Sequence, residues 1–373
     1  MSGTVYINGK FTAQPTTGVQ RVARCLVEAL DGLLAAPAGR TSTRWVLLCP
    51  PGAQLPELRQ IEVREVGGAR AGLHVWEQLV LPRAAREGLL LNLSGSAPAW
   101  AGPQVCTLHD AAVFDRPDAY SLVFRTWYRW LFRRLAHSAV AIHTVSQFSR
   151  LRLAERLGLG SDRIVVIPNG GDHLRRTVAD PSFLAEAGLT GRRFILAVGS
   201  ESANKNFATL IDAFGRVADR ALALVIAGGS RGAVFAAAGG AGPASDPRVV
   251  RLGPVGDAQL RALYGAAVAL VFASSYEGFG LPPLEAMSCG CPVVASSAAA
   301  VPEVCADAAL YVDPDSADDI ARAISRVSSD ATLRADLVLR GDVRIERFSW
   351  DAAAASLQAH VESLAARLNA GAV

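Results

Sequence analysis

Residues 269–297, ALVFASSYEGFGLPPLEAMSCGCPVVASS, decide how the fold is interpreted. An apolar run ends near Ser274, and a polar loop with two glycines follows it. Pro282-Pro283 suits the first turn of a helix, where a missing N–H costs nothing. Gly290 and Pro292 then predict the end of that helix, ahead of a second apolar run. The stretch therefore predicts a strand, a glycine loop, a short helix and another strand.

The loop of this stretch has the features of an anion-binding site. Gly278 and Gly280 flank Phe279, so the backbone can adopt positive φ and approach a ligand closely. Backbone amides at a helix N-terminus favour an anion, and phosphate is the obvious one. Glu277 and Glu285 stand on either side, and because carboxylates repel phosphate they should contact hydroxyl groups. A ligand with an anionic middle and hydroxylated ends is a sugar nucleotide.

Length and composition suit a two-domain protein with full cores. The chain has 373 residues, 51% of them apolar, and a formal net charge of +3, which indicates no nucleic-acid partner. The six cysteines are scattered, and the spacing of Cys289 and Cys291 is wrong for a zinc knuckle or a redox pair. No apolar run is long enough for a signal peptide or a membrane span. We therefore expect a reduced, soluble, cytoplasmic protein.

Apolar runs alternate with helical patterns in two series. In the first half they cover residues 4–8, 44–49, 61–66, 89–94, 104–108, 139–145 and 164–167. In the second half they cover residues 194–199, 222–227, 249–252, 268–273, 292–295 and 309–312. This alternation predicts parallel sheets covered by helices on both faces, hence an α/β fold of two doubly wound, Rossmann-like domains. A ligand is expected in the cleft at the carboxyl ends of both sets of strands.

The same pattern predicts the domain boundaries. Residues 1–172 form the N-terminal Rossmann-like domain, and residues 192–349 form the C-terminal domain, which binds the nucleotide sugar. The polar, irregular residues 173–191 are expected to link them. A last helical stretch, residues 350–373, can pack on either domain, including back onto the N-terminal one.

Three further candidates stand at predicted strand ends or helix starts. Lys205 precedes a helical run and can neutralise a leaving diphosphate; the alternative is a solvated lysine at a helix start. Gly18 opens a helix, where amides can meet phosphate or a second substrate, or where the chain simply caps the helix. His109, beside Asp110, ends a strand at the edge where sites collect; the alternative is a structural histidine.

The triplet Asp313-Pro314-Asp315 has the form of the DxD metal-diphosphate signature found in a different class of transferase. It ends a strand and precedes a helix that begins with acidic residues. Capping of that helix explains the triplet better than metal binding does. We therefore expect no bound metal.

Residues 121–139, SLVFRTWYRWLFRRLAHSA, predict an amphipathic basic helix. Arginines recur every four residues on one face, at Arg125, Arg129 and Arg133. The apolar residues expected broadly on another face are Phe124, Trp127, Tyr128, Leu131 and Leu135. With Trp127 and Trp130, such a helix could make peripheral contact with an anionic membrane. The alternative is a surface helix whose apolar side faces the sheet and whose arginines are solvated.

With these residues assembled, the chain resembles the family-4 retaining glycosyltransferases of the GT-B fold along nearly its whole length. The most specific match is the E-x7-E motif from Glu277 to Glu285, followed by AMSCG at 286–290. Supporting matches are TGVQR at 17–21, HD at 109–110, VSQFSR at 145–150, VIPNG at 166–170 and VPE at 301–303.

The resemblance implies roles for the residues of this motif. Glu277 would hold hydroxyls of the transferred sugar, and Glu285 would bind the ribose of the nucleotide. The amides around Phe279, Gly280 and Leu281 would face the sugar and the phosphate.

The resemblance also implies roles outside the motif. Lys205 would bind the diphosphate, His109 would contact the donor sugar near the reacting centre, and Gly18 would lie against the phosphates or the acceptor. Substitution would proceed on the front face with retention and without a metal, the leaving phosphate helping to deprotonate the acceptor. No protein nucleophile is then required. Domain closure and stabilisation of the departing diphosphate would supply the catalysis.

This chain departs from the family at the phosphate site. The family often carries arginine at the position of Ser200, and close relatives often carry one at Asn204. Ser200 remains a predicted donor-binding position, but neutralisation of phosphate depends more on Lys205 and on helix amides. Arg231 is a candidate replacement.

The resulting expectation is a hexosyltransferase of surface polysaccharide synthesis, such as that of lipopolysaccharide. The donor is a nucleotide sugar, with GDP-mannose favoured and UDP- or dTDP-sugars possible, because relatives with this N-terminus and HD motif are often mannosyltransferases. The acceptor is a glycan or a lipid-linked glycan at the inner face of the plasma membrane. Two alternatives are a GT-B sugar-nucleotide epimerase and a non-catalytic sugar-nucleotide-binding subunit.

Overall fold

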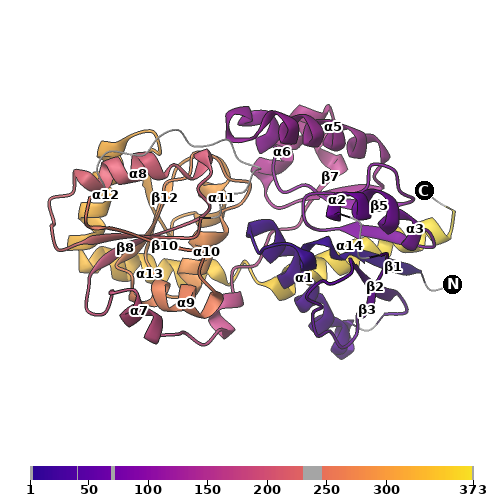
Figure 1. The fold of residues 1–373 in the computed structure, drawn as a ribbon, viewed down its shortest axis with the longest axis horizontal. Coiled ribbons are helices and arrows are strands. Elements are labelled where there is room, and N and C mark those ends of the chain that lie inside the picture. Colours follow the sequence, from indigo (N-terminus) through magenta and orange to yellow (C-terminus); the bar gives the residue numbers. More distant parts are fainter. Residues whose placement is uncertain (1–2, 40, 69–71, 230–245, 372–373) are drawn as a thin grey trace. The chain divides into compact units, whose positions relative to one another are not determined.

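The computed structural model describes residues 3–39, 41–68, 72–229 and 246–371 (Figure 1). The chain divides into two compact units. Unit 1 contains Met1–Ala111, Trp127–Asn169 and Trp350–Val373, and unit 2 contains Ala112–Thr126 and Gly170–Ser349.

Unit 1 is built on a seven-stranded parallel sheet. Its strands, in spatial order, are β3 (Glu62–Glu65), β2 (Arg44–Cys49), β1 (Thr4–Asn8), β4 (Leu89–Asn92), β5 (Gln104–Thr107), β6 (Ala141–Thr144) and β7 (Ile164–Val166). In this register Tyr6 of β1 pairs with Val46 on one side and Leu90 on the other. The chain therefore starts in the middle of the sheet and winds outward to both edges.

Helices cover the faces of this sheet. They are α1 (Gly18–Ala35), α2 (Leu73–Val75), the π-helical η3 (Trp76–Val80), α3 (Leu81–Ala84), α6 (Gln147–Leu157) and α14 (Trp350–Asn369), with α5 (Leu122–Ser138) shared between the units. Side chains alternate across a strand, so Tyr6, Val46 and Leu90 share one face and pack with Trp76 and Leu81.

The C-terminal helix α14 belongs to unit 1, where it packs on α1. Two hydrogen bonds tie it down: the Trp45 indole N–H donates to Glu362 at 3.3 Å, and the Gln358 amide donates to the carbonyl of Gly39 at 3.0 Å. Residues 350–373 therefore stand with the first half of the chain, because α14 buries its apolar side there.

Unit 2 is built on a six-stranded parallel sheet. Its strands, in spatial order, are β10 (Val249–Gly253), β9 (Ala223–Ala227), β8 (Phe194–Val198), β11 (Ala269–Phe272), β12 (Val293–Ser296) and β13 (Leu310–Val312). The main helices are α8 (Phe207–Gly215), α9 (Asp257–Ala266), α10 (Leu281–Ser288), α11 (Val301–Cys305), α12 (Ala317–Ser329) and α13 (Ala331–Ile345). Figure 1 shows α8 and α12 on one face of this sheet and α9 and α10 on the other.

Strand alternation again explains the core of unit 2. Ile195, Leu224 and Val271 point to one face, where Phe214 of α8 and Ile324 of α12 pack against them. These side chains are almost fully buried. The expectation of two parallel, doubly wound α/β sheets is confirmed, and each predicted apolar run overlaps one of the strands.

Two segments depart from the expected division of the chain. Residues 173–191, expected to be a linker, belong to unit 2 and contain η6 (His173–Arg176) and α7 (Ser182–Glu186), both packed on α9. Residues 112–126, which include α4 (Ala112–Asp115) and η4 (Pro117–Ala119), also group with unit 2. Within the described residues, no helix combines the length and apolar character needed to cross a bilayer.

Candidate active site

Lys205 and Glu277 meet at the ends of two neighbouring strands of unit 2. Lys205 ends η7 (Ala203–Lys205), which follows β8, and Glu277 lies in the loop after β11. Because β8 and β11 are parallel neighbours, their carboxyl ends lie at the same edge of the sheet. Lys205 Nζ lies 2.6 Å from Glu277 Oε1, and both side chains are mostly buried, at 16% and 13% exposed. The structure thus pairs the predicted phosphate cation with the predicted sugar carboxylate.

The backbone around Lys205 is held by its neighbour. Asn206 has a left-handed φ of 59°, and its side-chain amide donates to the carbonyls of Ala273 at 3.1 Å and Pro314 at 2.7 Å. The aliphatic stem of Lys205 passes over Gly199, where a Cβ would lie 3.2 Å from Lys205 Cδ. A glycine at the end of β8 therefore leaves room for the lysine to reach Glu277.

The glycine loop is anchored by its aromatic residue. Phe279 is only 6% exposed and packs edge to face on Phe348, with ring centroids 5.7 Å apart. Gly280 has a φ of 108°, which only glycine adopts without strain, and α10 begins at the next residue. Pro282 and Pro283 carry no N–H, so the terminal amides near the predicted phosphate position are those of Phe279, Gly280 and Leu281.

Glu285 is a buried carboxylate, 3% exposed, whose two oxygens face different partners. The hydroxyl of Tyr264 on α9 donates to Oε2 at 3.0 Å, and His173 Nε2 lies 3.1 Å from Oε1. Burial, and then the nearby Glu285 charge, raises the pKa of Tyr264 well above its usual value, so the phenol stays protonated and donates. Sequence reasoning missed Tyr264 and His173, because nothing in the local pattern links them to Glu285.

Ser200 occupies the position where the family often carries a phosphate-binding arginine, and the structure shows its surroundings. Ser200 Oγ lies 3.2 Å from Ser202 Oγ, and Arg231 falls outside the described residues. Arg116, which groups with unit 2, donates from Nη1 to Ser275 Oγ at 2.7 Å, two residues before Glu277. Sequence reasoning did not single out Arg116, because only tertiary packing brings it to the end of β11.

His109 lies at the carboxyl end of β5 in unit 1. Its Nε2 is 2.9 Å from the carbonyl oxygen of Leu93, which can only accept, so Nε2 carries a proton. Burial lowers the pKa of His109 and outweighs the opposing effect of this hydrogen bond. The ring is therefore neutral at physiological pH, with Nδ1 as an acceptor. A Cβ added at Gly95 would lie 3.5 Å from the ring, so the loop after β4 lines it closely.

Gly18 is the first residue of α1. No atom would lie within 4 Å of a Cβ placed there, so the position is open. The helix cap at Thr17 makes no side-chain bond to the helix backbone. His109 and Gly18 thus belong to unit 1, whereas the other predicted site residues belong to unit 2.

The acidic triplet acts as a helix start. Asp313 Oδ1 accepts from the backbone N–H of Asp315 at 2.9 Å, and Asp319 Oδ2 accepts from the N–H of Asp313 at 2.9 Å. Ser316 caps α12 through its hydroxyl, which accepts from the N–H of Asp319. Asp313 and Asp319 thus hold the turn before α12 through backbone N–H groups, and Ser316 caps the helix.

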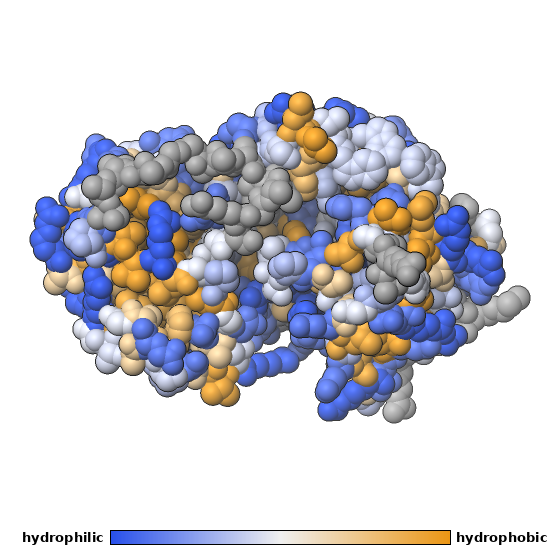
Figure 2. Space-filling view, viewed as in Figure 1, coloured by the Kyte–Doolittle hydropathy of each residue, from blue (hydrophilic) through white to orange (hydrophobic). Residues whose placement is uncertain are grey.

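Helix α5 exposes aromatic residues. Leu131 and Leu135 are fully buried, but Trp127, expected on the same face, is 36% exposed and Trp130 is 39% exposed. Their rings lie 5.0 Å apart, and Trp130 also lies 5.5 Å from Trp100, which is 64% exposed. In Figure 2 a short orange strip of apolar surface stands out in the mostly blue and white region over α5 and α6.

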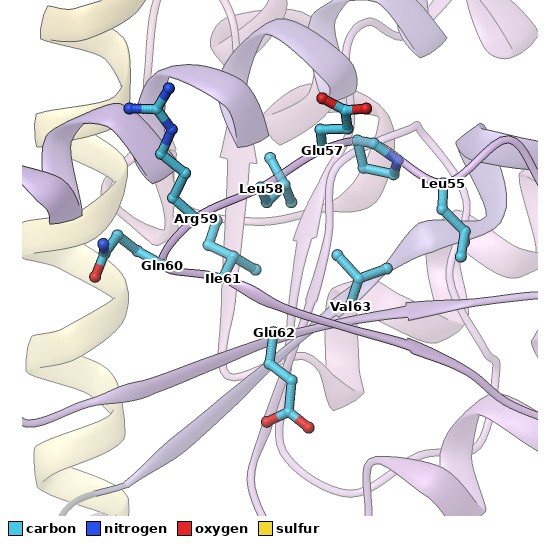
Figure 3. A pocket seen from close by; sticks show the side chains of 9 residues that line it. Leu55, Glu57, Leu58, Arg59, Gln60, Ile61, Glu62 and Val63 are labelled. Atoms are coloured by element: carbon cyan, nitrogen blue, oxygen red, sulfur yellow. The ribbon is translucent and has the colours of Figure 1, made fainter.

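A hollow of about 590 Å³ lies along the edge strand of unit 1 (Figure 3). Residues 55–63 line it, in and before β3. The Asp31 carboxylate fixes this stretch by accepting the backbone N–H groups of Arg59, Gln60 and Ile61. None of the predicted site residues lines the hollow.

Two parts of the chain match known families. Residues 192–330 match the family described as Glycosyl transferases group 1, and residues 73–175 match Glycosyltransferase Family 4. The fold and these matches define the class: the chain belongs to the family-4 glycosyltransferases, with the GT-B fold, and is an enzyme of that class.

Individual relatives agree with this class. The O-antigen chain mannosyltransferase B of Escherichia coli is 33% identical over 255 residues, which are 66% of this chain and 67% of that protein. Sucrose-phosphate synthase from Thermosynechococcus elongatus superposes with a TM-score of 0.73 at 19% identity, over 98% of this chain and 99% of that one. Anabaena HepE in complex with UDP and glucose gives a TM-score of 0.70 at 17% identity, over 97% and 100%. The two structures show the likeness of fold.

Proposed function

We propose that this glycosyltransferase moves a hexose from a nucleoside diphosphate sugar to a glycan or lipid-linked glycan acceptor, with retention and without a metal. The observation that carries the proposal is the meeting of Lys205, Glu277 and the first turn of α10 at one edge of the unit 2 sheet. This edge combines a cation, a carboxylate and backbone amides, which together suit a sugar diphosphate.

In this proposal the donor separates the ion pair. The diphosphate takes Lys205 Nζ and the amides around Gly280, and Glu277 then accepts hydroxyls of the hexose. Glu285 accepts hydroxyls of the ribose. Arg116, at the end of β11, is the candidate for the second cation that Ser200 does not supply.

His109 has a role that follows from its tautomer. With Nε2–H donating to Leu93, the neutral ring offers Nδ1 as an acceptor for a hydroxyl of the donor sugar. The leaving phosphate accepts the proton of the attacking acceptor hydroxyl, so the reaction needs no protein nucleophile. Positive charge from Lys205 stabilises the departing diphosphate, which is the role a metal has in other transferases.

GDP-mannose is the favoured donor, and mannose is then the transferred hexose. UDP- and dTDP-sugars are the other candidate donors. The support is the similarity to an O-antigen chain mannosyltransferase over two thirds of each chain. The same similarity supports a glycan or lipid-linked glycan acceptor in surface polysaccharide synthesis.

Acceptors of this kind are held at a membrane, so we also propose peripheral binding to the cytoplasmic face through α5. Tryptophan side chains favour the interface between lipid and water, and Trp100, Trp127 and Trp130 form an exposed cluster. Arginines of α5 add attraction to anionic headgroups.

The test is a thermal-shift screen followed by product analysis. GDP-mannose or GDP should raise the melting temperature most among GDP-, UDP- and dTDP-sugars, because a ligand of the folded state stabilises it. Transfer in the presence of EDTA should yield a product with the donor's anomeric configuration and one added hexose by mass. An absence of any nucleotide-dependent shift would contradict the proposed donor site, and an inverted product or loss of activity with EDTA would contradict the mechanism.

A further inference from the structure

The segment that enters unit 2 rests directly on the helix that carries Glu285. A Cβ at Gly171 would lie 2.5 Å from Leu284 Cβ and 2.9 Å from Ile345 Cδ1, so the backbone presses against α10 and α13. The N–H of Gly171 donates to the carbonyl of Phe348 at 2.8 Å. Residue 171 must therefore be glycine for the segment to come this close.

Because the segment lies so close to α10, His173 contacts the carboxylate of Glu285. His173 opens η6 two residues later, and its Nε2 lies 3.1 Å from Glu285 Oε1, with the side chains 11% and 4% exposed. Tyr264 approaches from α9 and donates to Oε2 at 3.0 Å. The two oxygens of the carboxylate thus face side chains from η6 and α9, which both precede α10 in the sequence.

We propose that His173 and Tyr264 are positioning residues that fix the plane of the Glu285 carboxylate for the ribose hydroxyls of the nucleotide. The inference rests on the proposed function, which assigns the ribose to Glu285. Each oxygen of a carboxylate can accept more than one hydrogen bond, so the contacts with His173 and Tyr264 are compatible with binding of ribose hydroxyls.

The energetics favour such support. A glutamate side chain rotates freely about its last bond, and ordering it at binding costs affinity. The hydrogen bond from Tyr264 and the close polar contact with His173 restrict this rotation in advance, so less of the cost falls on binding. The VIPNG motif at 166–170 directly precedes Gly171 and His173. In this proposal the motif therefore helps to position His173 beside Glu285.

The experiment compares nucleotides that differ only in the ribose. GDP and UDP, and their 2′,3′-dideoxy counterparts, are titrated calorimetrically into the wild-type chain and into His173→Phe, His173→Gln and Tyr264→Phe. We expect His173→Phe and Tyr264→Phe each to lose about tenfold in affinity for the ribonucleotide and none for the dideoxynucleotide. His173→Gln, which keeps an N–H donor, should recover most of the loss. Tyr311→Phe is the matched control, since the Tyr311 hydroxyl bonds the Ala306 carbonyl in the same unit but away from Glu285.

The outcomes distinguish a failure of the positioning role from a failure of the proposed function, which assigns the ribose to Glu285. Equal losses for both nucleotides, or none, in His173→Phe and Tyr264→Phe would overturn the positioning role. If Glu285→Gln shows no ribose-specific loss, the ribose role of Glu285 itself is wrong. A ribose-specific loss in Glu285→Gln alone would leave the proposed function standing and remove His173 and Tyr264 from it. Tyr264→Phe deletes a single hydroxyl, so the test survives even if His173→Phe fails to fold.

Discussion

Lys205 Nζ and Glu277 Oε1 lie 2.6 Å apart at the carboxyl ends of β8 and β11. Each side chain is the counterion of the other, and both are largely shielded from water, so removing one leaves an uncompensated charge. In the proposed function a diphosphate competes with Glu277 for the lysine. Substitutions at the two positions should therefore change nucleotide affinity in opposite directions.

Lys205→Met should weaken binding of GDP or UDP by about tenfold or more, because a charge-assisted contact with the diphosphate is lost. Binding of the free nucleoside should not change. Glu277→Gln should bind the same nucleotide at least as tightly as the wild type, yet lose about a hundredfold in transfer rate. Calorimetry and a transfer assay measure both effects.

Arg251→Gln is the control for this pair, because the Arg251 side chain is 51% exposed and its guanidinium lies 3.5 Å from Glu201. It should leave nucleotide affinity unchanged. Weaker nucleotide binding in Glu277→Gln would show that the carboxylate does not compete for Lys205.

Arg116→Gln should raise the KM for the nucleotide sugar several-fold, since we place its charge near the diphosphate. Arg116→Lys should fall between the wild type and Arg116→Gln, because lysine keeps the charge but not the planar fork. Arg152→Gln, at an exposed pair with Glu155, serves as the control. Steady-state kinetics measure the KM for the nucleotide sugar. An unchanged KM in Arg116→Gln would show that Arg116 is not the second cation.

Replacing Trp100, Trp127 and Trp130 together by serine should reduce binding to vesicles that contain anionic lipids, since the three exposed rings are the proposed anchors. Wild-type binding should weaken as salt screens the arginines of α5. Co-sedimentation measures both effects. The matched control is Leu339→Ser with Val343→Ser, which removes exposed apolar side chains of α13 instead. Equal losses in the two variants would argue against a specific membrane-binding helix.

His143 and His360 make stability depend on pH. His143 Nε2 lies 2.8 Å from His360 Nδ1, and burial, with His360 as the lesser cause, lowers the pKa of His143 from 6.5 to about 3. Below pH 6.5 the unfolded chain binds a proton that the folded chain does not. The free energy of unfolding should therefore fall by up to about 1.4 kcal/mol per pH unit from this site as the pH drops toward 3.

Urea unfolding at about pH 7.5 and about pH 5 measures this dependence. His143→Gln should reduce the loss of stability between the two conditions. His137→Gln, at an exposed position near the end of α5, should leave it as in the wild type. An unaltered pH dependence in His143→Gln would show that this pair does not titrate as described.

Gly228→Ala should destabilise unit 2 by about 2 kcal/mol or more, because the position combines a φ of 104° with a Cβ site 2.4 Å from the Gly199 carbonyl oxygen. Gly215→Ala is the contrasting change. It lies in α8 with no atom within 4 Å of the added Cβ, so it should be neutral or stabilising by up to about 1 kcal/mol. Thermal and urea unfolding compare the two, and similar effects would contradict the steric explanation.

Much of the fold was predictable because parallel strands buried on both faces are continuous apolar runs. Residues 4–8 and 44–49 coincide with β1 and β2, and the strand, loop and helix of 269–288 appear as β11, the glycine loop and α10. The E-x7-E pattern pointed to Glu277 and Glu285 as candidates because it lies within one short stretch of chain. Local spacing was less informative for α5, where Trp127 points outward although its helical position matches that of Leu131.

The sequence by itself determined which elements form and which family they belong to, since apolar periodicity, prolines, glycines and a contiguous motif are local properties of the chain. Only the tertiary structure decided which distant residues meet: Lys205 with Glu277, Tyr264 and His173 with Glu285, and His109 with Leu93. The physical reason is that such contacts depend on neighbouring strand ends and on the close approach at Gly171, and neither is visible in the spacing along the chain.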